Sequence, residues 1–124
     1  MTRPLALFVF ERLLPGGQLV NRLQDLGYRV QSMPGPAKLV EEAEREKPLL
    51  VLADLEPHRD SMCAAITRLK KNEATAHIPV IAFANSTEPQ TDETARTAGA
   101  TLVVSDNALL VHLEQFLEQA LQVD

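Results

Sequence analysis

The chain has 124 residues, of which 45% are hydrophobic and 23% are charged, values that are ordinary for one soluble globular domain spanning 1–124. Its formal net charge of −5 argues against nonspecific nucleic-acid binding, which needs a basic surface. Cys63 is the only cysteine, which excludes an internal disulfide and favours a reducing, cytoplasmic setting. No apolar run approaches the length of a membrane span, so we expect no membrane association.

Apolar runs and helical periodicities alternate along the first part of the chain. Residues 5–10 form an apolar run that predicts a buried strand. After a break at residues 15–17 (Pro-Gly-Gly), leucines at helical spacing predict a helix that Gly27 ends. A weaker, more peripheral strand at 28–33 and a charged helix at about 37–47 follow.

The stretch around which the chain is organised is the apolar run 49–54, which ends abruptly in Asp54. A short continuous apolar run is typical of a strand that is buried on both faces in the middle of a parallel sheet. Asp54 then stands at the carboxyl end of that strand, where open α/β sheets place their ligand sites. A carboxylate at this point predicts either a chemical role in a ligand site or a role as a helix cap.

The second half of the chain continues the alternation. We predict a helix capped by Asp60 or Ser61, a strand at 78–84, a weak and mobile helix at about 91–98, a strand at 101–104, and a last helix at about 108–122 with Ser105, Asp106 and Asn107 as candidate caps. Five strands separated by five helices, with short connections, predict a parallel sheet that is covered by helices on both faces.

Four short motifs carry a resemblance to a known family. They are Gly27-Tyr28, Asp54-Leu55, Ala-His-Ile-Pro-Val-Ile at 76–81 and Ala-Gly-Ala at 98–100. The chain resembles a response-regulator receiver domain of the CheY-like type over its whole length. The resemblance implies a flavodoxin-like, doubly wound (βα)5 three-layer sandwich with strand order 2-1-3-4-5, and it places Asp54 at the phosphoacceptor position.

The chain departs from the family at the positions that serve phosphorylation. The two acids that hold magnesium fall on Phe10 and Glu11, so one acid of two remains. The other degenerate positions are Ala84 for the threonine or serine after the fourth strand, Val103 for the aromatic that moves with it, and Asp106 for the lysine after the fifth strand. The proline after the acceptor stands one place early, as Pro57, and His58 takes its place.

These departures weaken the expected chemistry. Phosphoryl transfer to a carboxylate needs a divalent cation, and Glu11, Asp54 and the Glu56 carbonyl could supply only a reduced magnesium shell. Asp106 puts a negative charge where a cation normally meets the phosphoryl oxygens. Like charges about 4 Å apart at an effective dielectric near 20 repel by roughly 4 kcal/mol. We therefore expect no cofactor, or weakly bound Mg²⁺.

The same residues also have structural interpretations. Asp106 can be the N-cap of the last helix, and Glu11 can be a solvated residue paired with Arg12 or Arg59. Either arginine could also replace the missing lysine. A lone histidine in a loop, such as His58, is usually solvated.

Together these features predict a pseudo-receiver, a cytoplasmic signalling domain of a two-component or phosphorelay system that recognises a protein without phosphorylation and is not an enzyme. The expected partner is a signalling protein, a histidine kinase or a second copy, bound by the fourth helix, fifth strand and fifth helix at about 90–121. The alternatives are a single-domain receiver that is phosphorylated on Asp54 with Mg²⁺, and one module of a larger regulator. An enzyme has least support, because the sequence has no glycine-rich phosphate loop and no nucleophile with a base at readable spacing.

Overall fold

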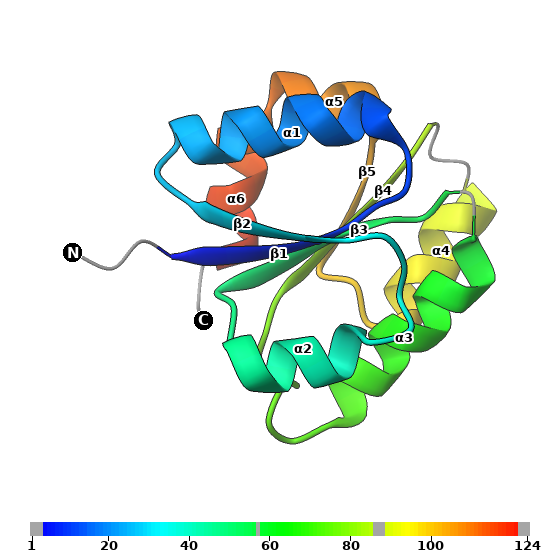
Figure 1. Cartoon of the computed structure of the whole chain (residues 1–124). Coiled ribbons are helices and arrows are strands. Elements are labelled where there is room, and N and C mark those ends of the chain that lie inside the picture. The colour runs from blue at the N-terminus through cyan, green and yellow to red at the C-terminus, as the bar shows by residue number, and fades with distance from the viewer. Residues whose placement is uncertain (1–3, 57, 86–88, 122–124) are drawn as a thin grey trace.

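The computed structural model describes residues 4–56, 58–85 and 89–121 (Figure 1). Pro57 and Gln122, which enter the expectations above, lie outside the described residues. In chain order the elements are β1 (Leu5–Val9), α1 (Leu13–Asp25), β2 (Arg29–Met33), α2 (Leu39–Glu46), β3 (Leu50–Asp54), α3 (Arg59–Lys71), β4 (Val80–Ala84), α4 (Pro89–Ala98), β5 (Leu102–Ser105), α5 (Asp106–Val111) and α6 (Leu113–Leu121).

The five strands form one parallel sheet in the order β2-β1-β3-β4-β5. Figure 1 shows α1, α5 and α6 on one face of the sheet and α2, α3 and α4 on the other. The predicted fold class and strand order are therefore confirmed. Among the described residues, no helix has the length and apolarity needed to cross a membrane.

The sheet is buried on both faces because successive strand residues point into two separate cores. In β1, Leu7 joins the core under α2 and α3, whereas Phe8 joins the core under α1, α5 and α6. In β3, Val51 joins the core under α2 and α3, and Leu52 joins the core under α1, α5 and α6. All five residues of β1, β3 and β4 are buried, which explains why these strands read as continuous apolar runs in the sequence.

Helix α1 begins at Leu13, so the break predicted at Pro15-Gly16-Gly17 is wrong. A proline is tolerated in the first turn of a helix, where the backbone N–H has no partner within the helix. Gly27 ends the segment as predicted, with a φ of 93° after the C-cap residue Leu26. The early start of α1 brings its first turn directly after the residues that leave β1.

The predicted last helix is broken at His112 into α5 and α6. Ser105 is the N-cap of α5, because its Oγ accepts a hydrogen bond from the Ala108 N–H at 3.2 Å. Asp106 and Asn107 lie inside the helix instead.

The prediction that Asp60 or Ser61 caps α3 is also wrong, since α3 begins at Arg59 and its N-cap His58 makes no side-chain capping bond.

Two neighbouring glycines in α1 offer a matched test of how closely this helix packs against the ring of Phe10. A Cβ at Gly16 would lie 2.5 Å from Cε2 of Phe10, whereas a Cβ at Gly17 would meet nothing within 4 Å. We expect Gly16→Ala to lower the free energy of unfolding by about 2 kcal/mol through overpacking. Gly17→Ala should raise it by about 0.5 kcal/mol, because alanine has the better helix propensity. Urea denaturation of both variants measures the difference, and equal effects would contradict the close contact between α1 and Phe10.

Candidate functional site

The site lies at the carboxyl ends of the strands and is centred on Arg12. Arg12 follows β1 in extended conformation, as the N-cap residue of α1. Its guanidinium meets the carboxylate of Asp54 with two hydrogen bonds, from Nε to Oδ2 at 2.9 Å and from Nη2 to Oδ1 at 2.7 Å. This is the two-pronged geometry that makes arginine–carboxylate pairs strong.

The same guanidinium also binds residues at the ends of β4 and β5. Nη1 donates to Oδ2 of Asp106 at 2.9 Å, and Nη2 donates to its Oδ1 at 3.1 Å. Nη1 further donates to Oδ1 of Asn85 at 2.7 Å. We call Arg12, Asp54, Asn85 and Asp106 the Arg12 clamp, because one side chain from the end of β1 joins the ends of three other strands.

The three charged members of the clamp are largely withdrawn from solvent, whereas Asn85 is exposed. The Asp54 side chain is 1% exposed, compared with 22% for Arg12 and 16% for Asp106. Burial raises the pKa of Asp54, while the hydrogen bonds from Arg12 and from the Glu56 N–H oppose that rise. The hydrogen bond to Asp54 raises the pKa of Arg12 above its ordinary value, so the guanidinium stays a cation. Two carboxylates therefore share one permanent positive charge.

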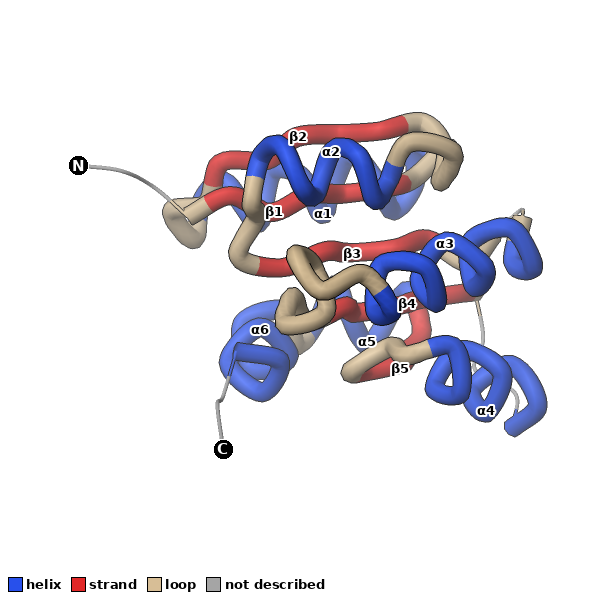
Figure 2. Tube along the Cα trace, turned by 90° about the horizontal axis from the view of Figure 1, so that it is seen from below, coloured by secondary structure: helices blue, strands red, loops and turns tan. Residues whose placement is uncertain are grey.

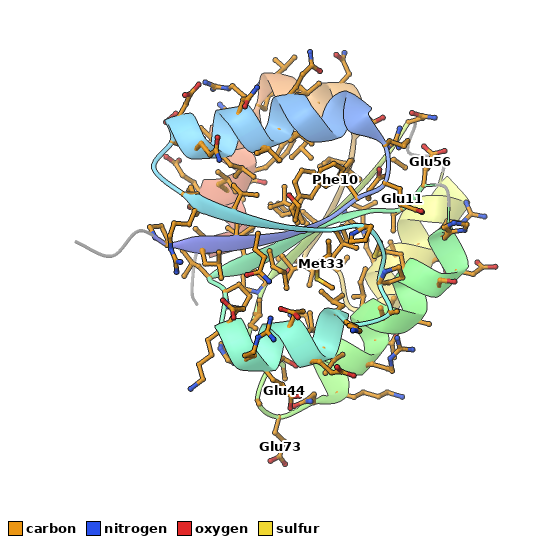
Figure 3. All side chains as sticks on the ribbon, viewed as in Figure 1. Phe10, Glu11, Met33, Glu44, Glu56 and Glu73 are labelled. Carbon is orange, nitrogen blue, oxygen red and sulfur yellow. The ribbon has the colours of Figure 1, made fainter. Side chains whose placement is uncertain are left out.

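Of the two other expected magnesium ligands, the Glu11 carboxylate has a partner of its own, and Glu56, which is expected to bind through its backbone carbonyl, has a separate partner for its side chain. Figure 3 shows both side chains at the carboxyl-terminal edge of the sheet. The Glu11 carboxylate lies 3.2 Å from Nε2 of His58, and the Glu56 carboxylate accepts a hydrogen bond from the Asn85 N–H.

The residues as arranged do not fit a magnesium ion. Nη2 of Arg12 occupies the space between the carboxylates of Asp54 and Asp106. Across the ranges 4–56, 58–85 and 89–121, no three histidine, cysteine or acidic residues gather where they could hold a metal ion. The positive charge at this site comes from the chain itself.

Comparison with known proteins gives matches in structure alone. No family model and no curated protein matches the sequence. Solved structures that match include the Vibrio cholerae chemotaxis protein CheY4, with a TM-score of 0.84, 15% identity and coverage of 96% of this chain and 99% of that one. The BeF3-activated N-terminal receiver domain of Klebsiella pneumoniae RstA has a TM-score of 0.83, 18% identity and coverage of 96% and 99%. A response regulator from Thermotoga maritima has a TM-score of 0.82, 18% identity and coverage of 97% and 98%.

The chain has the fold of a response-regulator receiver domain. Three of the four degenerate positions, at which the sequence departs from the family resemblance, contribute to the two cores. Phe10 packs against Phe8, with ring centroids 4.4 Å apart, and Figure 3 shows it beneath α1. Ala84 and Val103 are 4% and 7% exposed and belong to the core on the α2–α3 side. None of these three side chains can donate a hydrogen bond to a phosphoryl group.

Sequence reasoning found part of this site. The sequence leaves Arg12, Arg59 or another cation to replace the lysine that the family resemblance implies, and the structure places Arg12 in the clamp. Asn85 was not predicted, and the pairing of His58 with Glu11 was not predicted either. The sequence signal for the clamp is a pair of charge changes relative to the family. One acid is lost at Phe10, two positions before Arg12, and an acid, Asp106, stands at the position of the lysine.

Proposed function

We propose that this chain is a pseudo-receiver, a signalling domain in which an internal arginine takes the place of the metal ion and which recognises a protein partner without phosphorylation. The observation that carries the proposal is the Arg12 guanidinium bound to both Asp54 and Asp106. The domain acts by binding in the cytoplasm and not by catalysis. Its partner is a signalling protein or a histidine kinase, or a second copy of the chain.

The geometry opposes phosphorylation of Asp54 for two reasons. An attacking carboxylate oxygen must be free and must face the phosphorus, but both oxygens of Asp54 accept hydrogen bonds from Arg12, and Oδ1 accepts a further one from the Glu56 N–H. Release of Arg12 would also leave Asp54 and Asp106 facing each other without a cation. The clamp is thus the more stable arrangement in the absence of a competing cation.

The same contacts support one constant conformation. The clamp joins the end of β1 to the ends of β3, β4 and β5, and the hydroxyl and aromatic residues that move in a switching receiver are absent. We propose that α4, β5, α5 and α6, at about 90–121, present a constant binding face. Val111, the last residue of α5, is 66% exposed and is available for contact with a partner.

The second candidate is a receiver that is phosphorylated on Asp54. It is favoured by the position of Asp54 at the carboxyl end of the central strand β3. It requires that Arg12 leave both carboxylates when a divalent cation arrives. In either case the chain could serve as one module of a larger regulator, whose output domain would then define the biological role.

A phosphate-mimic titration separates the two candidates. Beryllofluoride with magnesium is added to the isotope-labelled chain, and amide chemical shifts are followed in α4, β5, α5 and α6. A pseudo-receiver shows no shifts on this face, and Asp54→Ala gives the same result. Shifts that saturate in the wild type and vanish in Asp54→Ala would favour the phosphorylated receiver.

A further inference from the structure

A groove lies between the β2–α2 connection and α3, on the side of the sheet that Figure 2 views. Its volume is about 490 Å³, and its lining residues are Pro36, Ala37, His58, Ser61, Ala64 and Arg68. We call it the α3 groove. A second hollow of about 600 Å³ adjoins it at Ala37 and includes Lys38 in its lining. Small side chains at positions 36, 37 and 64 leave room for a polypeptide backbone to approach closely.

The acidic residues beside the groove are already paired. Glu11 lies 3.2 Å from Nε2 of His58. Glu42 accepts a hydrogen bond from Gln31 at 2.9 Å and forms an ion pair with Arg45. The negative charge of Glu42 is therefore offset by Arg45, whereas Glu11 remains an acid in the lining of the second hollow.

The cations at the groove have no such partners. Within the part of the chain that the structure describes, the side chains of Arg68 and Lys38 make no hydrogen bond and no ion pair. Arg68 is exposed, and its guanidinium can hold a carboxylate with two parallel hydrogen bonds. Because no acid is among the described residues that line the α3 groove, the charge that Arg68 brings to it is positive.

Helix α3 extends this positive charge along one edge of the groove. It carries Arg59, Arg68, Lys70 and Lys71 against one acid, Asp60, in a chain whose net charge is −5. Lys70 donates to the carbonyls of Ala76 and Ile78 and Arg59 has an interaction of its own, so Arg68 and Lys71 carry the charge at this edge. Such a local reversal of sign steers a partner of opposite charge to one surface and repels it from the rest. The cationic area is too small, and the chain too acidic, for general nucleic-acid binding.

We propose that the α3 groove binds an extended acidic segment of a partner protein, with a carboxylate of that segment held by Arg68. The partner backbone lies along the small side chains between Ala37 and Ala64, and further carboxylates face Lys38 and Lys71. This deepens the proposed recognition role, because it assigns a second surface and a partner chemistry. It does not depend on the state of Asp54.

The test is an amide chemical-shift titration of the isotope-labelled full chain with an acetylated, amidated peptide of alternating glutamate and alanine. We expect shifts at residues 36–38 and 58–68, and weaker binding as salt rises. Arg68→Glu should weaken binding about tenfold. Arg22→Glu is the matched control, because it makes the same charge change on an exposed residue of α1, on the other face of the sheet, and it should leave the affinity unchanged.

Several results would overturn the proposal. These are the absence of peptide shifts, shifts confined to α4, β5, α5 and α6, an equal loss of affinity in Arg68→Glu and Arg22→Glu, and tighter binding of a DNA oligonucleotide of equal charge. Failure here leaves the proposed pseudo-receiver role standing. Phosphorylation of Asp54 would overturn that role and leave the peptide result unaffected, so the two failures are distinguishable.

Discussion

Replacement of Arg12 with alanine is expected to lower the free energy of unfolding by about 3 kcal/mol at neutral pH. The loss is large because Asp54 is 1% exposed and would be left buried as a charge, facing Asp106 without a cation. Urea denaturation measures the change. Arg22→Ala, at an exposed position of α1, is the control and should cost less than about 0.5 kcal/mol.

The cost of Arg12→Ala should also depend on pH. Burial already raises the pKa of Asp54 in the folded chain, and loss of Arg12 removes the strongest opposing interaction. Above about pH 4, the ordinary pKa of aspartate, the folded state then binds a proton more tightly than the unfolded state. The free energy of unfolding therefore falls as pH rises through the pKa of Asp54 in the folded chain.

The variant should thus lose least near pH 4 and most near pH 7. Adding Asp54→Asn to Arg12→Ala removes the titrating group and should flatten the pH dependence. If Arg12→Ala is as stable as the wild type at neutral pH, or if its cost is the same at both pH values, then the clamp does not contribute the stability that its geometry indicates.

The second large effect is a gain of metal binding in the same variant. Nη2 of Arg12 lies 2.7 Å from Oδ1 of Asp54 and 3.1 Å from Oδ1 of Asp106, so it marks a point where two carboxylates can reach one cation. With the guanidinium removed, a hard divalent cation can take that point with water completing its coordination. We expect about 10 mM MgCl₂ to raise the Tm of Arg12→Ala by about 4 °C.

The wild type should show no comparable rise, because its own guanidinium already occupies the point between the two carboxylates. Addition of Asp106→Asn to Arg12→Ala removes one of the two acids and should abolish most of the effect. An equal magnesium response in the wild type and in Arg12→Ala would show that the arginine does not occupy the cation position.

The layout of the fold could be predicted because its signals are local. Residues 50–53 are apolar because β3 lies between β1 and β4 and is buried throughout, whereas Leu49, also predicted in this strand, precedes it and is 44% exposed. Gly27 marks the end of the first helical segment because it adopts a positive φ that other residues rarely adopt. Each of these features depends on residues that are close in sequence, so it can be predicted from one sequence alone.

The clamp could be predicted only in part, because it depends on contacts between distant residues. Arg12 and Asp54 are 42 positions apart, and Arg12 and Asp106 are 94 apart. Several arginines could have reached these carboxylates, and side-chain reach is not visible in sequence. Asp106 also satisfied the usual preferences of an N-cap, yet Ser105 has that role and the carboxylate of Asp106 is bound by Arg12.

The most direct test of the central claim is incubation of the wild-type chain with acetyl phosphate and magnesium, followed by intact-mass measurement. Asp54→Ala is the control for the site of any modification. The clamp predicts that the wild type gains no phosphoryl mass while a conventional receiver domain in the same buffer does. A phosphoryl mass on the wild type that is absent from Asp54→Ala would contradict the account, because Arg12 would then have yielded Asp54 to the phosphodonor.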